Sequence, residues 1–290
     1  MWPEPDDPDT TRRMREAHRR ARTRLRVRPA PGLEAWGWGG RTLGQAVTTP
    51  TGDAWLRLAC TPPDRTDRTF WDGGATAEQE LPRAIPRPRL RRWIDWPDET
   101  WTYRAELYDR VEGHLIAPAA TLTTTPELGD EWWNSLRTAV DSIARIATER
   151  RTIHQHYIDS AMRHFLGVPL DTGVQSWKTA HGDLHWANLA TPLEIIDWEG
   201  WGLAPTGYDI ASLVTHSLLI PSINERVRHE FADLLDSPAG RFAELVTITE
   251  NLHSATQGSN LQLVEPMSAR AEAILGRPIP ELRPLHTRRP

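Results

Sequence analysis

The sequence predicts an α+β fold with two lobes, the first built mainly from strands and the second mainly from helices. Apolar and polar residues alternate between residues 41 and 60, which is the period of β-strands. Beyond residue 130, apolar residues recur at helical spacing. Between these regions, residues 117–126 hold prolines and threonines without a periodic core pattern. We therefore expect an N-terminal lobe over residues 1–116 and a C-terminal lobe over residues 117–290.

Local patterns define the elements of the N-terminal lobe. Met14, Ala17, Ala21 and Leu25 form one apolar stripe at helical spacing, and arginines occupy the other face of that helix. A Pro-Thr-Gly-Asp turn separates the first two strands, and a Glu-Gly turn separates the last two. The expected elements are a helix over residues 10–27, strands over residues 41–48 and 54–60, a short helix from residue 76, and strands over residues 102–110 and 114–116.

The C-terminal lobe is expected to be mainly helical. A stripe of apolar residues that begins at Trp132 repeats at helical spacing, and similar stripes follow later in the chain. The expected helices cover residues 132–147, 152–166, 223–235 and 239–253. Between the second and third of these, residues 189–190 and 193–196 are expected to form a short hairpin across Thr191-Pro192.

Composition and charge narrow the class of protein. The chain has 290 residues, of which 39% are hydrophobic and 25% charged, as is typical of a globular protein. A net charge of -5 does not favour a nucleic-acid partner, and a single cysteine, Cys60, excludes an intrachain disulfide. The sequence opens without a signal-peptide pattern, and its longest apolar stretch, residues 210–220, is too short and polar to span a bilayer. We expect a cytoplasmic protein with no membrane partner.

The residues with the clearest chemistry lie between residues 181 and 199. Asp183 and Asn188 are five positions apart on a loop, and the expected hairpin brings Asp197 back beside Asn188. One carboxylate and one amide oxygen then converge, and Mg²⁺ prefers such oxygen ligands together with phosphate oxygens and water. Asp183 remains nearby to accept a proton from a hydroxyl nucleophile. Positioning and charge neutralisation are most of what phosphoryl transfer requires of a protein.

Two ordered motifs resemble those of a known family. The run His-Gly-Asp-Leu-His-x-x-Asn at residues 181–188, followed by Ile-Ile-Asp-Trp-Glu at residues 195–199, resembles the catalytic and metal-binding motifs of the aminoglycoside phosphotransferase and choline kinase-like family. That family is similar in fold to the protein kinases, so the resemblance implies a small antiparallel-sheet N-terminal lobe and a mainly helical C-terminal lobe. It also implies that Asp183 is the catalytic base and that Asn188 and Asp197 are the Mg²⁺ ligands.

The resemblance extends to a nucleotide site in the N-terminal lobe. Gly37, Gly39 and Gly40 cluster before the first strand, and a glycine-rich turn lets backbone N–H groups approach phosphates closely. Arg57 stands where the family usually has a phosphate-binding lysine, and it keeps the positive charge and can grip two phosphate oxygens. His185 either contacts phosphate or substrate, or only orders its loop.

The carboxylate partner of Arg57 is expected on the short helix that begins at residue 76. Glu78 and Glu80 are both candidates. Glu78 shares a helical face with Leu81 and Ile85, so we prefer Glu78.

These residues favour an enzyme that uses ATP and Mg²⁺ to move the γ-phosphoryl group to a hydroxyl of a small molecule. One alternative keeps the chemistry and changes the acceptor to a serine or threonine of a peptide or protein, as in natural-product biosynthesis. A second alternative is a pseudokinase scaffold, suggested by Arg57 and by the bulky Trp55 two residues before it. The complete set of Asp183, Asn188 and Asp197 argues against a scaffold.

Overall fold

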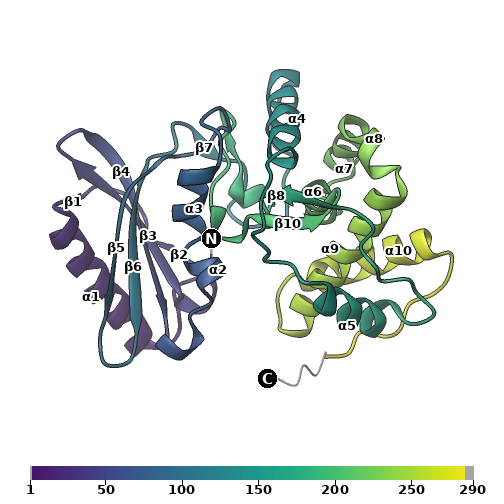
Figure 1. Ribbon diagram of the computed structural model, residues 1–290, viewed down its shortest axis with the longest axis horizontal. Coiled ribbons are helices and arrows are strands. Elements are labelled where there is room, and N and C mark those ends of the chain that lie inside the picture. Colours follow the sequence, from purple (N-terminus) through teal and green to yellow (C-terminus); the bar gives the residue numbers. More distant parts are fainter. Residues whose placement is uncertain (1, 285–290) are drawn as a thin grey trace. The chain divides into compact units, whose positions relative to one another are not determined.

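The computed structural model describes residues 2–284, so the extreme ends of the two predicted lobes, Met1 and residues 285–290, lie outside the described residues. The chain divides into two compact units (Figure 1). The first unit contains Met1–His114 together with Glu194–Glu199, and the second contains Leu115–Leu193 together with Gly200–Pro290. The prediction assigned all of residues 117–290 to the C-terminal lobe, whereas Glu194–Glu199 belong to the first unit.

The first unit is an antiparallel sheet with a helix on each face. Its strands run in the order β1-β3-β4-β6-β5, and β2 pairs with β3. The strands are β1 (Arg28–Pro29), β2 (Ala35–Trp36), β3 (Thr42–Thr49), β4 (Gly52–Thr61), β5 (Leu90–Pro97) and β6 (Thr102–Asp109). The helices are α1 (Pro8–Leu25), α2 (Arg68–Trp71) and α3 (Gly73–Glu80), with short 3₁₀ turns η1 (Trp38–Gly40) and η2 (Pro63–Arg65).

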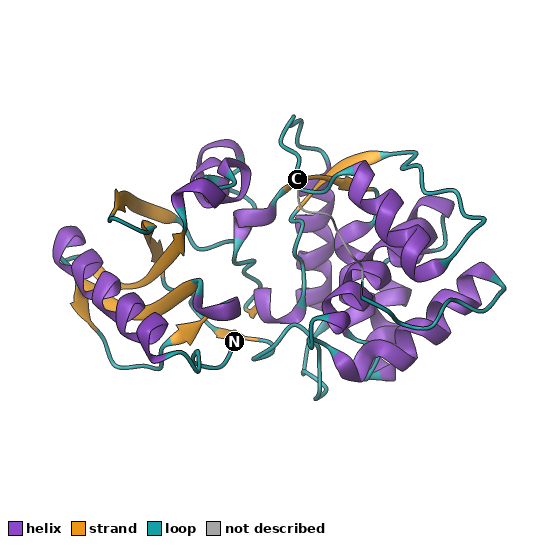
Figure 2. Cartoon of the chain, turned by 90° about the horizontal axis from the view of Figure 1, so that it is seen from below, coloured by secondary structure: helices purple, strands orange, loops and turns teal. Residues whose placement is uncertain are grey.

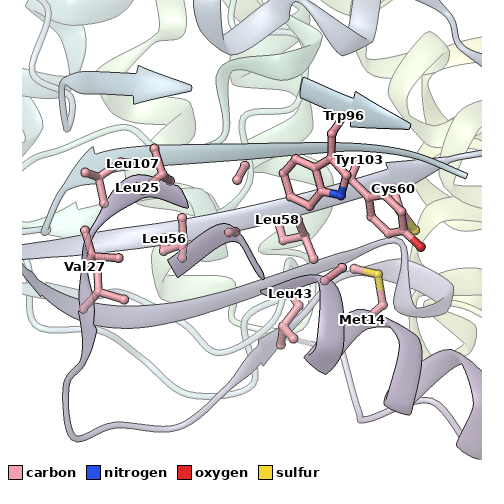
Figure 3. Packing of buried hydrophobic residues seen from close by; sticks show 14 of the residues in the cluster. Met14, Leu25, Val27, Leu43, Leu56, Leu58, Cys60, Trp96, Tyr103 and Leu107 are labelled. Carbon is pink, nitrogen blue, oxygen red and sulfur yellow. The ribbon is translucent and has the colours of Figure 1, made fainter. Parts of the chain in front are cut away.

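Helix α1 covers one face of this sheet and closes its apolar core. Asp7 caps the first turn by accepting hydrogen bonds from the backbone N–H groups of Asp9 and Thr10. The predicted apolar stripe of α1 packs on β3, β4 and β6, and Figure 3 shows Met14 and Leu25 of this stripe among the buried side chains of the sheet. Because side chains alternate along a strand, the residues between these core positions point to the opposite face, which α3 approaches.

The second unit is mainly helical, as Figure 2 shows by colour. Its helices are α4 (Asp130–Ala144), α5 (Gln155–Leu166), α6 (Tyr208–His216), α7 (Pro221–Glu230), α8 (Ala232–Leu235), α9 (Pro238–Thr256) and α10 (Val264–Leu275). Helix α9 is central, and α5, α6, α8 and α10 pack around it. No helix of the described chain is long and apolar enough to cross a bilayer.

Short strands and 3₁₀ turns lie in the segments that connect the helices of the second unit. Strand β8 (Trp177–Ala180) pairs with β10 (Gly202–Pro205), and β7 (His114–Leu115) pairs with β9 (Ala190–Thr191). The 3₁₀ turns η3 (Trp186–Asn188) and η5 (Leu261–Leu263) belong to the second unit, whereas η4 (Trp198–Gly200) begins in the segment Glu194–Glu199 of the first unit.

The predicted helices and the strands predicted over residues 41–48, 54–60 and 102–110 are confirmed to within a few residues, except that the helix predicted over residues 223–235 is divided into α7 and α8. Two predicted strand pairings were wrong. The stretch at 114–116 was expected to pair with the strand before it, whereas β7 pairs with β9. The hairpin expected across Thr191-Pro192 does not form, because β9 is already paired and the N–H of Ile195 donates to the carbonyl of Pro86 at 2.9 Å.

Candidate active site

The loop at residues 181–189 is fixed by a buried aspartate of the second unit. Asp209, in the first turn of α6, accepts hydrogen bonds from the backbone N–H of His181 at 2.7 Å and of Gly182 at 3.0 Å. Gly182 has φ +82°, and a Cβ there would lie 2.2 Å from the carbonyl oxygen of Gly200. The turn after β8 therefore requires glycine at this position. Burial raises the pKa of Asp209 to about 6, while the two N–H donors act in the opposite direction.

Asp183 extends from this loop with its carboxylate open to solvent. Its side chain is 57% exposed, and its Oδ2 lies 3.6 Å from Nε2 of His185. Asn188 donates from Nδ2 to the carbonyl oxygen of Asp183 at 2.9 Å, which ties the end of η3 back to the start of the loop. The structure thus brings three predicted site residues together: Asp183, His185 and Asn188.

His185 is neutral at physiological pH. Burial lowers its pKa to about 4, and its ring meets that of His216 edge-on, with centroids 5.8 Å apart. A neutral imidazole at this position adds no positive charge beside the Asp183 carboxylate.

The base of the loop rests on tryptophans. Trp186, within η3, is fully buried and lies against Trp132 and Trp133 at centroid distances of 6.4 and 6.2 Å. Its indole N–H donates to the carbonyl of Leu213 at 3.3 Å. These aromatic contacts hold the loop by packing, and Trp186 is unavailable to line a substrate pocket.

The first unit holds a separate charged cluster around Arg57 on β4. Nη1 of Arg57 donates to Oε2 of Glu106 on β6 at 3.0 Å. Nη2 donates to Glu199 and lies 3.6 Å from Oδ1 of Asp197. Burial disfavours the charge of Arg57, but the carboxylates of Glu199, Asp197 and Glu106 raise its pKa well above the ordinary value. Arg57 therefore remains a fixed positive charge.

Asp197 lies in the segment that returns to the first unit. Its backbone is left-handed, with φ +64°, which is uncommon for a residue other than glycine. The indole N–H of Trp198 donates to the carbonyl of Ile195 at 2.8 Å and stabilises the tight turn around Asp197. The Asp197 side chain is 37% exposed, so this turn leaves the carboxylate partly accessible. Strain held at one residue is a feature of functional turns.

The predicted pairing of Arg57 with Glu78 was wrong. Glu78 binds the guanidinium of Arg89 and accepts a hydrogen bond from the N–H of Leu90 at 3.3 Å. Glu80, the other candidate, is exposed. The helix face near the Arg57 cluster carries Gly74 instead, and a Cβ there would lie 2.9 Å from Oε1 of Glu106.

The sequence pattern of β6 could have identified Glu106 as the partner of Arg57, but the prediction considered only residues at helical spacing. Glu106 lies between the buried apolar residues Ala105 and Leu107 of β6, and its side chain is only 3% exposed. A charged side chain buried in a strand needs an opposite charge nearby, which the neighbouring strand supplies through Arg57.

The predicted glycine cluster forms the tight turn between β2 and β3. Gly39 and Gly40 have positive φ angles of 57° and 71°. A Cβ at Gly39 would meet nothing within 4 Å, whereas a Cβ at Gly40 would lie 2.5 Å from the ring of Pro5. The N–H of Gly37 donates to the carbonyl of Thr42 within the turn. Packing thus accounts for Gly40, and phosphate binding by the turn stays a prediction.

The oxygen ligands expected for Mg²⁺ are chemically suitable. The Nδ2 of Asn188 donates to the carbonyl of Asp183, so the Oδ1 of Asn188 is the atom that a cation would meet, and Asp197 keeps a partly exposed carboxylate. Within residues 2–284, no group of three or more His, Cys, Asp or Glu side chains is arranged to hold a metal ion. Mg²⁺ needs no such cage, since it is usually held by one or two protein ligands together with substrate phosphates and water.

Comparison with known proteins identifies the fold. No family model matches the chain, and no curated protein sequence matches it. The crystal structure of aminoglycoside phosphotransferase APH(4)-Ia aligns with a TM-score of 0.60 at 14% identity, covering 90% of this chain and 98% of that one. A thermostable mutant of that enzyme in a ternary complex with ADP and hygromycin B aligns with a TM-score of 0.62 at 14% identity and the same coverage. The chain has the two-lobed, protein kinase-like α+β fold that the motifs implied.

Proposed function

We propose that the protein is an ATP-dependent phosphotransferase that moves the γ-phosphoryl group of ATP to a hydroxyl of a small molecule. The observation that carries this proposal is the exposed carboxylate of Asp183 on a loop whose backbone is held by Asn188 and Asp209. The similarity in fold to a phosphotransferase solved with ADP and hygromycin B supports it.

Asp183 is the proposed catalytic base. Its carboxylate is exposed enough to meet an incoming hydroxyl, and it accepts the proton as the oxygen attacks the γ-phosphorus. Asn188 donates to the backbone carbonyl of Asp183 and so holds this residue in the loop, and the neutral imidazole of His185 lies 3.6 Å from its carboxylate. A fixed carboxylate beside the acceptor reduces the entropic cost of reaching the transition state.

The remaining predicted residues bind the nucleotide and its metal ion. Asn188 and Asp197 would hold Mg²⁺, which when bound neutralises charge on the phosphate oxygens. Arg57 binds a phosphate oxygen through its guanidinium, and the backbone of the Gly37–Gly40 turn approaches the phosphates.

Phosphoryl transfer from radiolabelled ATP tests this proposal directly. The acceptors are a panel of hydroxyl-bearing small molecules alongside serine- and threonine-containing peptides. We expect label on a small molecule, and we expect Asp183→Asn to lower turnover by at least about a hundredfold. Asp236→Asn, at an exposed aspartate in the second unit, is the matched control and should leave turnover unchanged. Equal turnover by the wild type and Asp183→Asn would show that Asp183 is not the base.

A further inference from the structure

Arg57 and Glu106 are direct neighbours across the sheet of the first unit. The register of β4 and β6 pairs Arg57 with Glu106, and the register of β3 and β4 places Gly44 on the other side of Arg57. Paired residues on adjacent antiparallel strands project from the same face. The side chain of Arg57 is 18% exposed and that of Glu106 is 3% exposed, so water screens their interaction weakly.

Helix α3 has no carboxylate in a position to replace Glu106. Its first turn, Gly73 and Gly74, approaches the cluster so closely that side chains are excluded. A Cβ on Gly73 would lie 2.3 Å from the carbonyl oxygen of Glu199, and a Cβ on Gly74 would lie 2.4 Å from the hydroxyl of Tyr108. One turn further along, Glu78 is engaged by Arg89. The carboxylate that holds Arg57 therefore comes from a strand.

The two terminal nitrogens of Arg57 have different partners. Nη1 binds Glu106, which is almost fully buried, whereas Nη2 binds Glu199, whose side chain is 43% exposed. A guanidinium has five donors in a rigid plane, so one side can be anchored while the other meets a second anion. The single ammonium of a lysine lacks this geometry. A carboxylate on the adjacent strand therefore suits an arginine at position 57, because the guanidinium can bind Glu106 and a second anion at the same time.

We propose that Glu106 is the positioning residue of Arg57, holding Nη1 from the adjacent strand so that Nη2 is presented to a phosphate oxygen of the nucleotide. This inference rests on the proposed function and assigns to β6 the role that the sequence suggested for α3. When phosphate binds, Nη2 exchanges Glu199 for a phosphate oxygen, while Nη1 stays on Glu106. No covalent bond changes in this step.

Binding of ATP and of adenosine, each measured with Mg²⁺ by calorimetry, separates positioning from general stability. We expect Glu106→Gln to weaken ATP binding about tenfold or more, because a charge-assisted hydrogen bond that orients Arg57 is lost. Adenosine lacks phosphates, so its affinity should stay within about twofold of the wild type, a difference that is negligible on the scale of binding energies. Glu78→Gln, the matched control on α3, should leave both affinities unchanged.

A second variant keeps the test decisive if Glu106→Gln does not fold. Arg57→Lys retains a positive charge opposite Glu106 but cannot bind on both sides, so it should also weaken ATP binding and spare adenosine. The positioning role alone would be overturned if Glu106→Gln and Glu78→Gln changed the affinity for ATP equally. It would also be overturned if Glu106→Gln weakened adenosine binding as much as ATP binding. Absence of ATP binding by the wild-type protein would overturn the proposed function and this inference together.

Discussion

The indole ring of Trp55 lies directly over Gly44 on the neighbouring strand of the sheet. A Cβ at Gly44 would fall 2.6 Å from Cζ2 of Trp55, a separation that real side chains do not reach. Trp55 and Arg57 are two residues apart on β4 and share a face, so Gly44 makes room for the ring beside the proposed phosphate-binding arginine. Gly44 thus accommodates the bulk of the Trp55 side chain.

Substituting Gly44 should destabilise the first unit. We expect Gly44→Ala to lower the free energy of unfolding by about 1–3 kcal/mol, the usual cost of overpacking. Urea denaturation measures this change. In a Trp55→Leu background the same substitution should cost less, because the ring that blocks the Cβ is gone. Gly200→Ala is the control, since a Cβ there would make only ordinary contacts at 3.8 Å. An equal cost in both backgrounds would contradict the contact.

Removing the carboxylate of Asp209 should loosen the catalytic loop. Asp209→Ala leaves the backbone N–H groups of His181 and Gly182 without their acceptor. Each unsatisfied buried donor costs about 1–3 kcal/mol, so we expect a loss of about 2–6 kcal/mol in the free energy of unfolding. Hydrogen exchange should show the amides of His181 and Gly182 exchanging faster than in the wild type. Unchanged protection of these two amides would show that Asp209 does not hold the loop.

The ion-pair network of Glu244 should stabilise the helical unit. Glu244 on α9 is 1% exposed and accepts hydrogen bonds from Arg228 at 2.6 and 3.1 Å and from Arg270 at 2.8 and 2.9 Å. Removing the charge from one member of a buried network leaves the others uncompensated. We therefore expect Glu244→Gln to cost about 3 kcal/mol in the free energy of unfolding. Glu225→Gln, at an exposed position of α7, should change it by less than about 0.5 kcal/mol.

His18 should make the first unit sensitive to acid. It is 3% exposed, its Nε2 lies 3.3 Å from the carbonyl of Leu56, and burial lowers its pKa to about 4. The unfolded chain binds a proton below about pH 6.5, whereas the folded protein resists protonation until about pH 4. The stability that depends on neutral His18 is therefore present above pH 6.5 and lost as the pH falls toward 4.

Denaturation of the wild type and His18→Gln at pH 7.5 and 5.5 tests this assignment. Between these two conditions, the wild type should lose about 1.4 kcal/mol more than the variant, because the lower pH lies one unit below the ordinary pKa. The difference between the two losses removes any constant effect of the substitution itself. Equal losses would mean that His18 titrates normally in the folded protein.

Local patterns predicted much of the fold. Helix α1 and strands β3 and β4 could be predicted from the period of apolar residues and from a turn sequence. Both signals depend only on residues that are close together in the sequence. Strand β5 was missed because it follows a proline-rich run and contains Arg91-Arg92, which disturb the alternation where β5 has a bulge. Periodicity detects regular strands and overlooks those whose register shifts.

Long-range pairing accounts for the other errors. Nothing local in the sequence shows that Ile195 hydrogen-bonds to Pro86, or that Glu106 opposes Arg57 on the adjacent strand. Both contacts depend on how distant segments align with each other, and the spacing of residues within one helix or loop does not determine this alignment. The residues brought together at Asp183 were identified because their motif is compact in sequence.

The proposed function depends on binding of ATP through a site that uses Mg²⁺ and Asp197. Thermal unfolding with ATP, with and without Mg²⁺, tests it most directly for the wild type and Asp197→Ala. A ligand at a hundred times its Kd stabilises the folded state by about 2.7 kcal/mol, so the wild type should show a clear Mg²⁺-dependent rise in Tm that Asp197→Ala loses. No shift of the wild-type Tm at saturating ATP, with GTP also inert, would contradict the phosphotransferase account and favour a scaffold.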